Sequence, residues 1–244
     1  MGVSRAICAA TIVLLTACSP GPDTVVSPVS VEAGYRLSYN DILVGHSLFV
    51  LQIDSDGGYR MHAFTTPAGE LRQGDGHEVL ETSQGAMHSD AVYPGRFEKS
   101  VVAGKDMQVD RLVFDWEKRL RHRTGTQGEH TGVLLPGTQD RLSYILAAWQ
   151  LALAGEGSTQ IQIVSPGKTD TTRLKVIGVE PVDVPFGKFE AVAVRRMTHK
   201  PNVIRALWFD TGLGPLPLRV VHGRAGNTVD MKLESLSRQP NHPR

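Results

Sequence analysis

The sequence predicts a mainly β protein, in which an antiparallel sheet packs on one amphipathic α-helix. Two observations indicate this fold class. After residue 30, most segments alternate apolar and polar residues with a period of two, which is the period of a half-buried strand. Only one segment repeats apolar residues at the three- and four-residue spacing of a helix. Because strands and helices do not alternate along the chain, a parallel sheet is not expected.

Composition limits the classes of protein to which the chain can belong. Its 244 residues are 41% hydrophobic and 21% charged, which excludes wholesale disorder and a protein with many membrane spans. The 26 Lys and Arg residues nearly balance the 25 Asp and Glu residues, so nucleic acid is not expected as a partner. The two cysteines, Cys8 and Cys18, are too few for a disulfide framework or a cysteine-rich metal site.

Residues 1–17 have the features of a lipoprotein signal peptide. Arg5 precedes the apolar run 6–15, which is too short to span a bilayer, since that needs about 20 residues. The letters LTAC, ending at Cys18, resemble the bacterial lipobox, whose cysteine is acylated by fatty acids such as palmitate and becomes the new N-terminus. Lipidation is therefore expected at Cys18; the alternative is an ordinary secretory signal. Ser19 replaces the Asp that retains such lipoproteins in the inner membrane, so we expect an outer-membrane anchor on the periplasmic side.

The rest of the chain divides into a tether, one domain and a tail. Residues 18–30 are rich in Pro, Ser and Gly and predict a flexible tether. A single β-rich domain is expected over residues 31–238, and residues 239–244 form a frayed tail. Alternation predicts the first strands around residues 35–39, 48–51, 59–63 and 107–116, and residues 117–123 are expected to continue the last of these. A turn is predicted at 54–58.

The helical segment follows residues 136–138. Its predicted buried stripe consists of large apolar residues: Leu142, Ile145, Leu146, Trp149 and Leu153. Thr138 is the expected N-cap, Asp140 suits the first turn, and the glycines at 155 and 157 end the helix.

The second half returns to the strand pattern. Predicted strands lie around 160–163, 171–180, 189–196, 204–208, 216–220 and 229–233. The stripe through Ile204, Ala206 and Trp208 is expected to face inward. Residues 185–187 and 223–227 provide turns.

Short pieces of sequence carry a family resemblance. In chain order they are residues 35–39 with Gly45, 139–143 at the start of the helix, 172–176 before the turn 185–187, and 207–209 before 216–220. Their order and spacing, over roughly 33–236, resemble the bacterial family catalogued as domain of unknown function 3108. The resemblance implies an exported, β-rich protein and carries no reaction. By analogy with the lipoprotein carriers of the outer-membrane pathway, it also implies a half-open β-barrel with a plugging helix.

Catalytic motifs are not recognisable. Gly45-His46-Ser47 begins like a nucleophile elbow, but Phe49 stands where that motif needs a glycine. No two of the nine histidines have the spacing of a helical zinc pair. We therefore expect no catalytic residue, metal or cofactor.

Three polar or apolar segments leave alternatives open. Arg119, Arg121 and Arg123 either contact lipid phosphates or form a solvated strand face. The apolar segment 132–136 either touches a membrane or lipid or is a buried strand end. Asp140 and Arg141 either position a ligand at the helix N-terminus or cap the helix and brace it against the sheet.

The resulting hypothesis is a non-catalytic lipoprotein that binds a lipid or apolar ligand in a concave sheet or supports envelope assembly. The expected ligand-binding side chains are Tyr35, Tyr39, Phe114 and Trp208. The alternative is a protein–protein adaptor, for example to an envelope protein, with a filled β core and no ligand cavity; an enzyme ranks third. A continuous apolar cavity favours the first function, and a filled interior favours the second.

The lipobox generates a prediction about anchoring. Cys18→Ser removes the thiol that is acylated, so the variant should be recovered as soluble or unprocessed protein. Membrane fractionation measures this outcome, with wild-type protein as the control. Recovery of Cys18→Ser in the outer membrane at the wild-type level would contradict lipidation.

Overall fold

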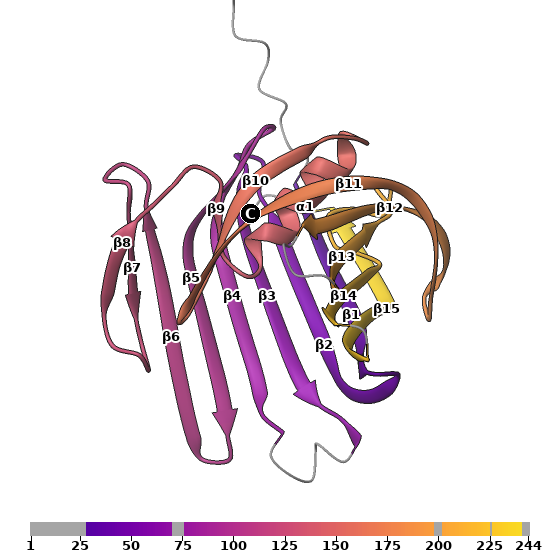
Figure 1. The fold of residues 1–244 in the computed structure, drawn as a ribbon, viewed down its shortest axis with the longest axis horizontal. Helices are drawn as coiled ribbons and strands as arrows, with labels where there is room; N and C mark the ends of the chain where they lie inside the picture. The colour runs from indigo at the N-terminus through magenta and orange to yellow at the C-terminus, as the bar shows by residue number, and fades with distance from the viewer. Residues whose placement is uncertain (1–27, 70–75, 198–201, 225, 241–244) are drawn as a thin grey trace, which may run out of the picture.

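The structure is a computed structural model, which describes residues 28–69, 76–197, 202–224 and 226–240. In these residues fifteen strands form a single sheet that is antiparallel except for one short parallel pair, β9 with β10. The sheet curls around the helix α1 without closing, and β8 and β9 are its two edges (Figure 1). The predicted fold, a mainly β protein with an open sheet and one helix, is confirmed.

The strands fall into two arms. The first arm consists of β1 (Val29–Tyr39), β2 (Ile42–Ile53), β3 (Gly58–Pro67), β4 (Glu78–Met87), β5 (Val92–Ala103), β6 (Asp106–Asp115), β7 (Leu120–Thr124) and β8 (His130–Val133). The second arm consists of β9 (Thr138–Gln139), β10 (Ser158–Ser165), β11 (Lys168–Val184), β12 (Gly187–Met197), β13 (Val203–Phe209), β14 (Arg219–Arg224) and β15 (Asn227–Pro240). The helix α1 (Ser143–Leu153) lies between β9 and β10 in the chain.

The two arms meet where β1 pairs with β15. This pairing runs from Val29 opposite Pro240 to Tyr39 opposite Val229. Strand pairing therefore extends two residues beyond the expected domain, 31–238, at each end. The expected signal peptide, residues 18–27 of the expected tether and residues 241–244 of the expected tail 239–244 lie outside the described residues.

Local hydrogen bonds explain one confirmed turn and one wrong prediction. At residues 54–58 the amide of Asp54 donates to the Gly58 carbonyl at 2.8 Å, and the β2–β3 turn forms as predicted. Residues 117–123 do not continue the strand before them. The Asp115 carboxylate accepts from the Lys118 amide at 2.9 Å, and Arg119 adopts a left-handed φ of 54°. This side-chain-stabilised turn reverses the chain between β6 and β7.

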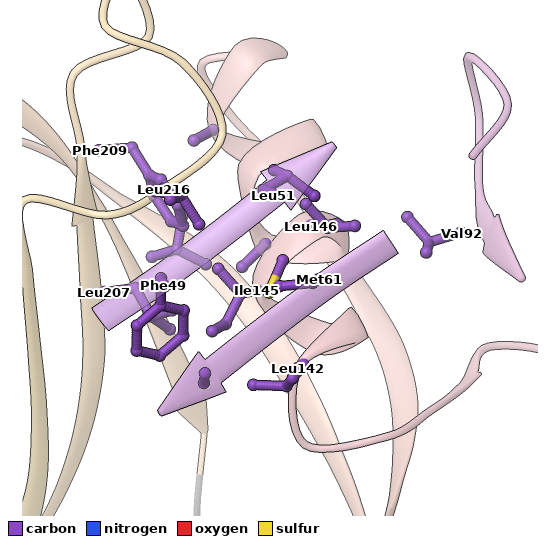
Figure 2. Close-up of a cluster of buried hydrophobic side chains, with 14 of the residues drawn as sticks. Phe49, Leu51, Met61, Val92, Leu142, Ile145, Leu146, Leu207, Phe209 and Leu216 are labelled. Atoms are coloured by element: carbon purple, nitrogen blue, oxygen red, sulfur yellow. The ribbon is translucent and has the colours of Figure 1, made fainter. Parts of the chain in front are cut away.

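The main core fills the space between the curled sheet and α1. Figure 2 shows Leu51 of β2 and Met61 of β3 packed near Ile145 and Leu146 of α1, with Leu207, Phe209 and Leu216 from the second arm alongside. The helix therefore occupies the concave side of the sheet.

The predicted inward stripe of β13 is wrong in its orientation. Leu207 and Phe209 face α1, and strand alternation turns Ala206 and Trp208 to the other face of the sheet. All four side chains are buried. Because both faces of β13 are buried here, alternation of apolar residues does not indicate which face points toward α1.

The buried face of α1 also differs from the prediction at its end. Leu142, Ile145 and Leu146 are buried as expected, but Trp149 is half-buried and Leu153 is 50% exposed. The buried line continues through Ala148 and Ala152 instead. Small side chains there allow the helix to lie close to the sheet.

A buried carboxylate begins the helix. The predicted N-cap, Thr138, is wrong, because Thr138 lies in β9 and its hydroxyl donates to the Leu135 carbonyl at 2.7 Å. The N-cap position is Leu142, and Asp140, two residues earlier, stabilises the helix start: its Oδ1 accepts from the amides of Leu142 at 2.7 Å and Ser143 at 2.8 Å. Gly155, with φ of 75°, follows the last turn as predicted.

The same carboxylate ties the helix to the sheet. Ser83 of β4 donates to Asp140 Oδ2 at 2.6 Å, and the Tyr59 hydroxyl of β3 lies 2.9 Å from the Ser83 hydroxyl. Burial raises the pKa of Asp140 to about 6, although hydrogen bonds from Ser83, Ser143 and Leu142 oppose the shift. We call Tyr59, Ser83, Asp140 and Ser143 the helix-start network.

The packing of α1 predicts that truncating two of its leucines to alanine lowers the free energy of unfolding by different amounts. Leu146→Ala should lower the free energy of unfolding by about 2–5 kcal/mol, because it leaves a cavity in the core. Leu153→Ala is the matched control, since Leu153 is half exposed, and its cost should stay within about 1 kcal/mol. Urea denaturation measures both. Equal costs would contradict the described face of the helix.

The helix-start network predicts a pH dependence. A folded-state pKa of about 6, against the ordinary 3.8, means that the folded protein binds the Asp140 proton more tightly than the unfolded chain. The free energy of unfolding should therefore fall by up to about 3 kcal/mol as the pH rises from 4 to 7. Asp140→Asn removes this titration, so its stability relative to wild type should increase over the same range. Parallel pH curves for the two proteins would contradict the raised pKa.

Asp140→Ala tests the hydrogen bonds of the same residue. At pH 4 it should lower the free energy of unfolding by about 2–3 kcal/mol, because the Leu142 and Ser143 amides lose their acceptor. Asp140→Asn retains an acceptor oxygen and should lose less at that pH.

Candidate functional site

The two tyrosines predicted to bind a ligand have different environments. Tyr35 is fully buried; its ring packs on Phe49 at 5.3 Å between centroids, and its hydroxyl donates to the Pro217 carbonyl at 2.8 Å. Tyr39 is 41% exposed, and its hydroxyl donates to Asn227 Oδ1 at 2.5 Å. Tyr35 thus belongs to the core, and Tyr39 to the surface at the end of β1.

The other two predicted residues are buried on different elements. Phe114 of β6 belongs to the main core. The Trp208 indole donates to Glu180 Oε2 at 2.8 Å, and the Arg219 guanidinium lies 5.2 Å from its ring centroid, on the face away from α1. Neither these two residues nor the tyrosines line any of the hollows described below, and their ligand-binding role stays a prediction.

Three adjoining open hollows form what we call the basic groove. The seam hollow, of about 270 Å³, lies between the arms and is lined by Leu112, Arg121, Arg123, His130, Val164, Ser165, Gly167, Lys168 and Thr169. The rim hollow, of about 190 Å³, is lined by Arg141, Tyr144, Ile163, Ser165, Lys168, Asp170, Arg196, Arg205 and His222. The outer hollow, of about 640 Å³, shares Lys168, Asp170, Arg205 and His222 with the rim hollow. The shared residues place the three hollows side by side.

Strand register places the basic side chains of the rim hollow in one row. Arg205 of β13 stands opposite His222 of β14, and the β12–β13 pairing that ends at Arg195 opposite Ala206 brings Arg196 beside Arg205. Alternation puts Arg196 and Arg205 on the same face as the buried Val194 and Leu207. The core stripe of each strand therefore ends in an arginine at the rim of the concave face.

The first turn of α1 completes the rim hollow. Arg141 Nε lies 2.7 Å from Glu81 Oε1 of β4, an ion pair that braces the helix start against the sheet. Tyr144 lines the hollow one turn later, among Arg141, Arg196 and Arg205. Burial raises the pKa of the Tyr144 hydroxyl, and the three guanidiniums partly offset that rise.

One carboxylate faces many cations. Among the residues that line the three hollows, Asp170 is the single acid, whereas the cationic side chains are Arg121, Arg123, Arg141, Lys168, Arg196, Arg205 and Arg224. Asp170 Oδ2 binds Arg196 Nη2, accepts from Arg205 Nη1 at 3.1 Å and lies 3.6 Å from Lys168 Nζ. Burial alone would raise the pKa of Asp170, but these cations outweigh it and the pKa lies below its ordinary value. The groove therefore keeps a strong excess of positive charge.

Several guanidiniums of the groove retain unused donors. The Nε atoms of Arg121, Arg123, Arg196 and Arg205 are buried and have no hydrogen-bond acceptor among the described residues. Burial and then the neighbouring Arg205 lower the pKa of Arg196, and burial and Arg123 do the same for Arg121. Burial lowers the pKa of His222, and the nearby cations lower it further. Mutually repelling cations that line open hollows favour a bound anion.

The sequence arguments found part of this site. Arg121 and Arg123 were assigned to lipid phosphates or to a solvated face, and both line the seam hollow; Arg119 lies in the β6–β7 turn instead. Arg196 and Arg205 were missed. The signal was present, because each continues the period-two positions of buried residues, Val194 and Leu207, but the inverted orientation of β13 concealed it.

Two further segments resolve their alternatives. Asp140 and Arg141 cap and brace the helix, and Arg141 also lines the rim hollow. The apolar segment 132–136 divides: Leu134 is buried, whereas Val133 and Leu135 are exposed.

Two requirements, those of a metal site and of a membrane-spanning helix, are not met in the described ranges. No three His, Cys, Asp or Glu residues there are arranged to hold a metal ion. No helix in those ranges is long and apolar enough to cross a membrane.

Comparison with known proteins gives a family and a fold. A family model described as "Protein of unknown function (DUF3108)" matches residues 34–234. No curated protein matches the chain. Among solved structures, a beta-barrel-like protein of the domain of unknown function DUF1849 from Brucella abortus is similar, with a TM-score of 0.57 and 14% identity. The match covers 88% of this chain and 99% of that one, and it supports the architecture alone.

Proposed function

The chain belongs to the DUF3108 family, and we propose that it is a non-catalytic binding protein for an anionic ligand, held in the basic groove. The proposal includes the envelope location expected from the sequence: a lipid anchor on Cys18 at the periplasmic side of the outer membrane. A phosphate group is the best-fitting anion, because guanidinium forks match its oxygens.

The observation that supports this function is the pairing of excess charge with unused donors. Seven cationic side chains line the groove with one carboxylate, although the whole chain has a net charge of only +1. Gathering cations in a protein lowers its stability, and a bound anion offsets that repulsion. The planar guanidiniums of Arg196 and Arg205 line the rim hollow and can add directional hydrogen bonds to their charge.

The location of the groove changes the expected ligand. The concave side of the sheet is filled by α1 and the main core, so an apolar ligand inside it is not favoured. The hollows lie at the rim and along the seam, with charged linings. The ligand therefore has an anionic group, which belongs either to a lipid headgroup or to a free phosphate compound.

An adaptor function is the second candidate. Leu48, Phe64 and Leu80 stand directly opposite one another on β2, β3 and β4, and each is 40% exposed. With a filled core, such an apolar row on a sheet face suits a protein partner. Failure of anion binding in the following experiment would favour this function.

The proposal predicts phosphate binding that depends on the rim arginines. Full-length protein in neutral detergent should bind inorganic phosphate at low ionic strength, measured by calorimetry. Arg196→Gln/Arg205→Gln should bind about tenfold more weakly or worse, since a charge-assisted hydrogen bond contributes about 1.5–3 kcal/mol. If short-chain phosphatidylglycerol competes with phosphate, the anion belongs to a lipid headgroup. If it does not compete, the ligand is a free phosphate compound.

A matched control removes the same charge elsewhere. Arg36→Gln/Arg111→Gln breaks two exposed ion pairs, with Glu234 and Glu98, outside the basic groove. It should retain wild-type phosphate binding. Equal losses in the two double variants, or no phosphate binding by the wild type, would overturn the proposed site.

A further inference from the structure

We propose that the ligand carries at least two anionic groups and spans the seam hollow and the rim hollow, so that it holds together the two arms of the open sheet. This inference rests on the proposed anion binding and narrows the ligand to a class, that of polyanions such as compounds with two or more phosphates.

The seam between the arms is made by side chains. The edge strands β8 and β9 do not pair with each other, so the ladder of backbone hydrogen bonds stops there. Across this gap Arg121 Nη1 of β7 donates to the Thr169 hydroxyl of β11 at 2.8 Å. Gly167, with φ of 76°, lies against Gln127, and a Cβ at Gly167 would stand 2.6 Å from Gln127 Nε2. These side-chain contacts bring β7 and the β10–β11 hairpin together, while the backbone segment 134–137 links β8 to β9.

Each side of the seam contributes its own pair of arginines with buried, unpartnered Nε donors. Arg121 and Arg123 belong to the first arm, and Arg196 and Arg205 to the second. The first pair lines the seam hollow, and the second lines the rim hollow. One small anion in one hollow neutralises only the arginine pair that lines it, whereas two linked anionic groups reach both pairs.

The junction of the two hollows allows a continuous ligand. Ser165 and Lys168, at the β10–β11 turn, line both. Because Lys168 lines both hollows, it adds a cation at their junction. A chain of anionic groups that passes Lys168 meets cations in both hollows, with Asp170 as the one acid beside them.

Comparison of inorganic phosphate with tripolyphosphate tests the inference on full-length protein in neutral detergent. Tripolyphosphate should bind wild type at least about 100-fold more tightly than phosphate, because linked groups bind with a high effective concentration. Arg121→Gln/Arg123→Gln should abolish most of that gain, measured as the ratio of tripolyphosphate to phosphate affinity within the variant. Arg36→Gln/Arg111→Gln should retain the gain.

The outcomes separate the two proposals. No binding of either anion by wild type overturns the proposed function itself. Phosphate binding without a tripolyphosphate gain, or a gain that survives Arg121→Gln/Arg123→Gln, overturns the bridging ligand and leaves the proposed function in place. Short-chain cardiolipin carries two phosphates and phosphatidylglycerol carries one. If cardiolipin binds more tightly and Arg121→Gln/Arg123→Gln removes that difference, the polyanion is a lipid headgroup.

Hydrogen exchange of the wild type provides a readout that does not depend on the stability of any variant. A ligand that ties the arms should slow amide exchange in β7, β8 and β10 by about tenfold or more with tripolyphosphate, and much less with phosphate at equal saturation. Equal protection by both anions would overturn the bridging role.

Discussion

A single buried carboxylate determines how the concave side of this sheet is filled. Asp140 satisfies two amides at the start of α1 and accepts a hydrogen bond from Ser83 of β4. The helix therefore begins at a fixed point on the first arm, although it also packs on β10, β11, β12 and β13 of the second arm. Arg141 and Tyr144 follow within the next turn, so the position of the helix also sets one wall of the basic groove.

The groove illustrates a conflict between stability and binding. Lowered pKa values at Arg196, Arg121 and His222 show that burial and like charges disfavour their cationic forms. The strands β12 and β13, which carry Arg196 and Arg205, pack on α1, so the core fixes the places from which these two side chains extend. A rigid apolar scaffold thus supports a cluster of cations that would disperse on a flexible surface.

The sequence predicted elements with strong local signals and failed where tertiary structure overrode them. The single helix and the turn at 54–58 follow from spacing and turn residues. Strand β4, by contrast, has mostly polar and small residues, and β5 contains Pro94 and Gly95, so neither shows clear alternation. The groove could not be predicted without knowing which strands are neighbours. The row from Arg196 through Arg205 to His222 joins residues of three strands, and no local sequence pattern reveals their register.

The pairing of β1 with β15 has a consequence for how the chain reaches this structure. The strand synthesised first obtains one of its two neighbours only from the last strand, since Val29 pairs with Pro240. Contacts between such distant residues form slowly, because closing a long loop costs entropy before the contact contributes. Until β15 is available, β1 is an exposed edge that can pair with the wrong chain. Folding of this protein is therefore limited by the time during which its first strand must remain unpaired, and truncation at the C-terminus would leave that edge open permanently.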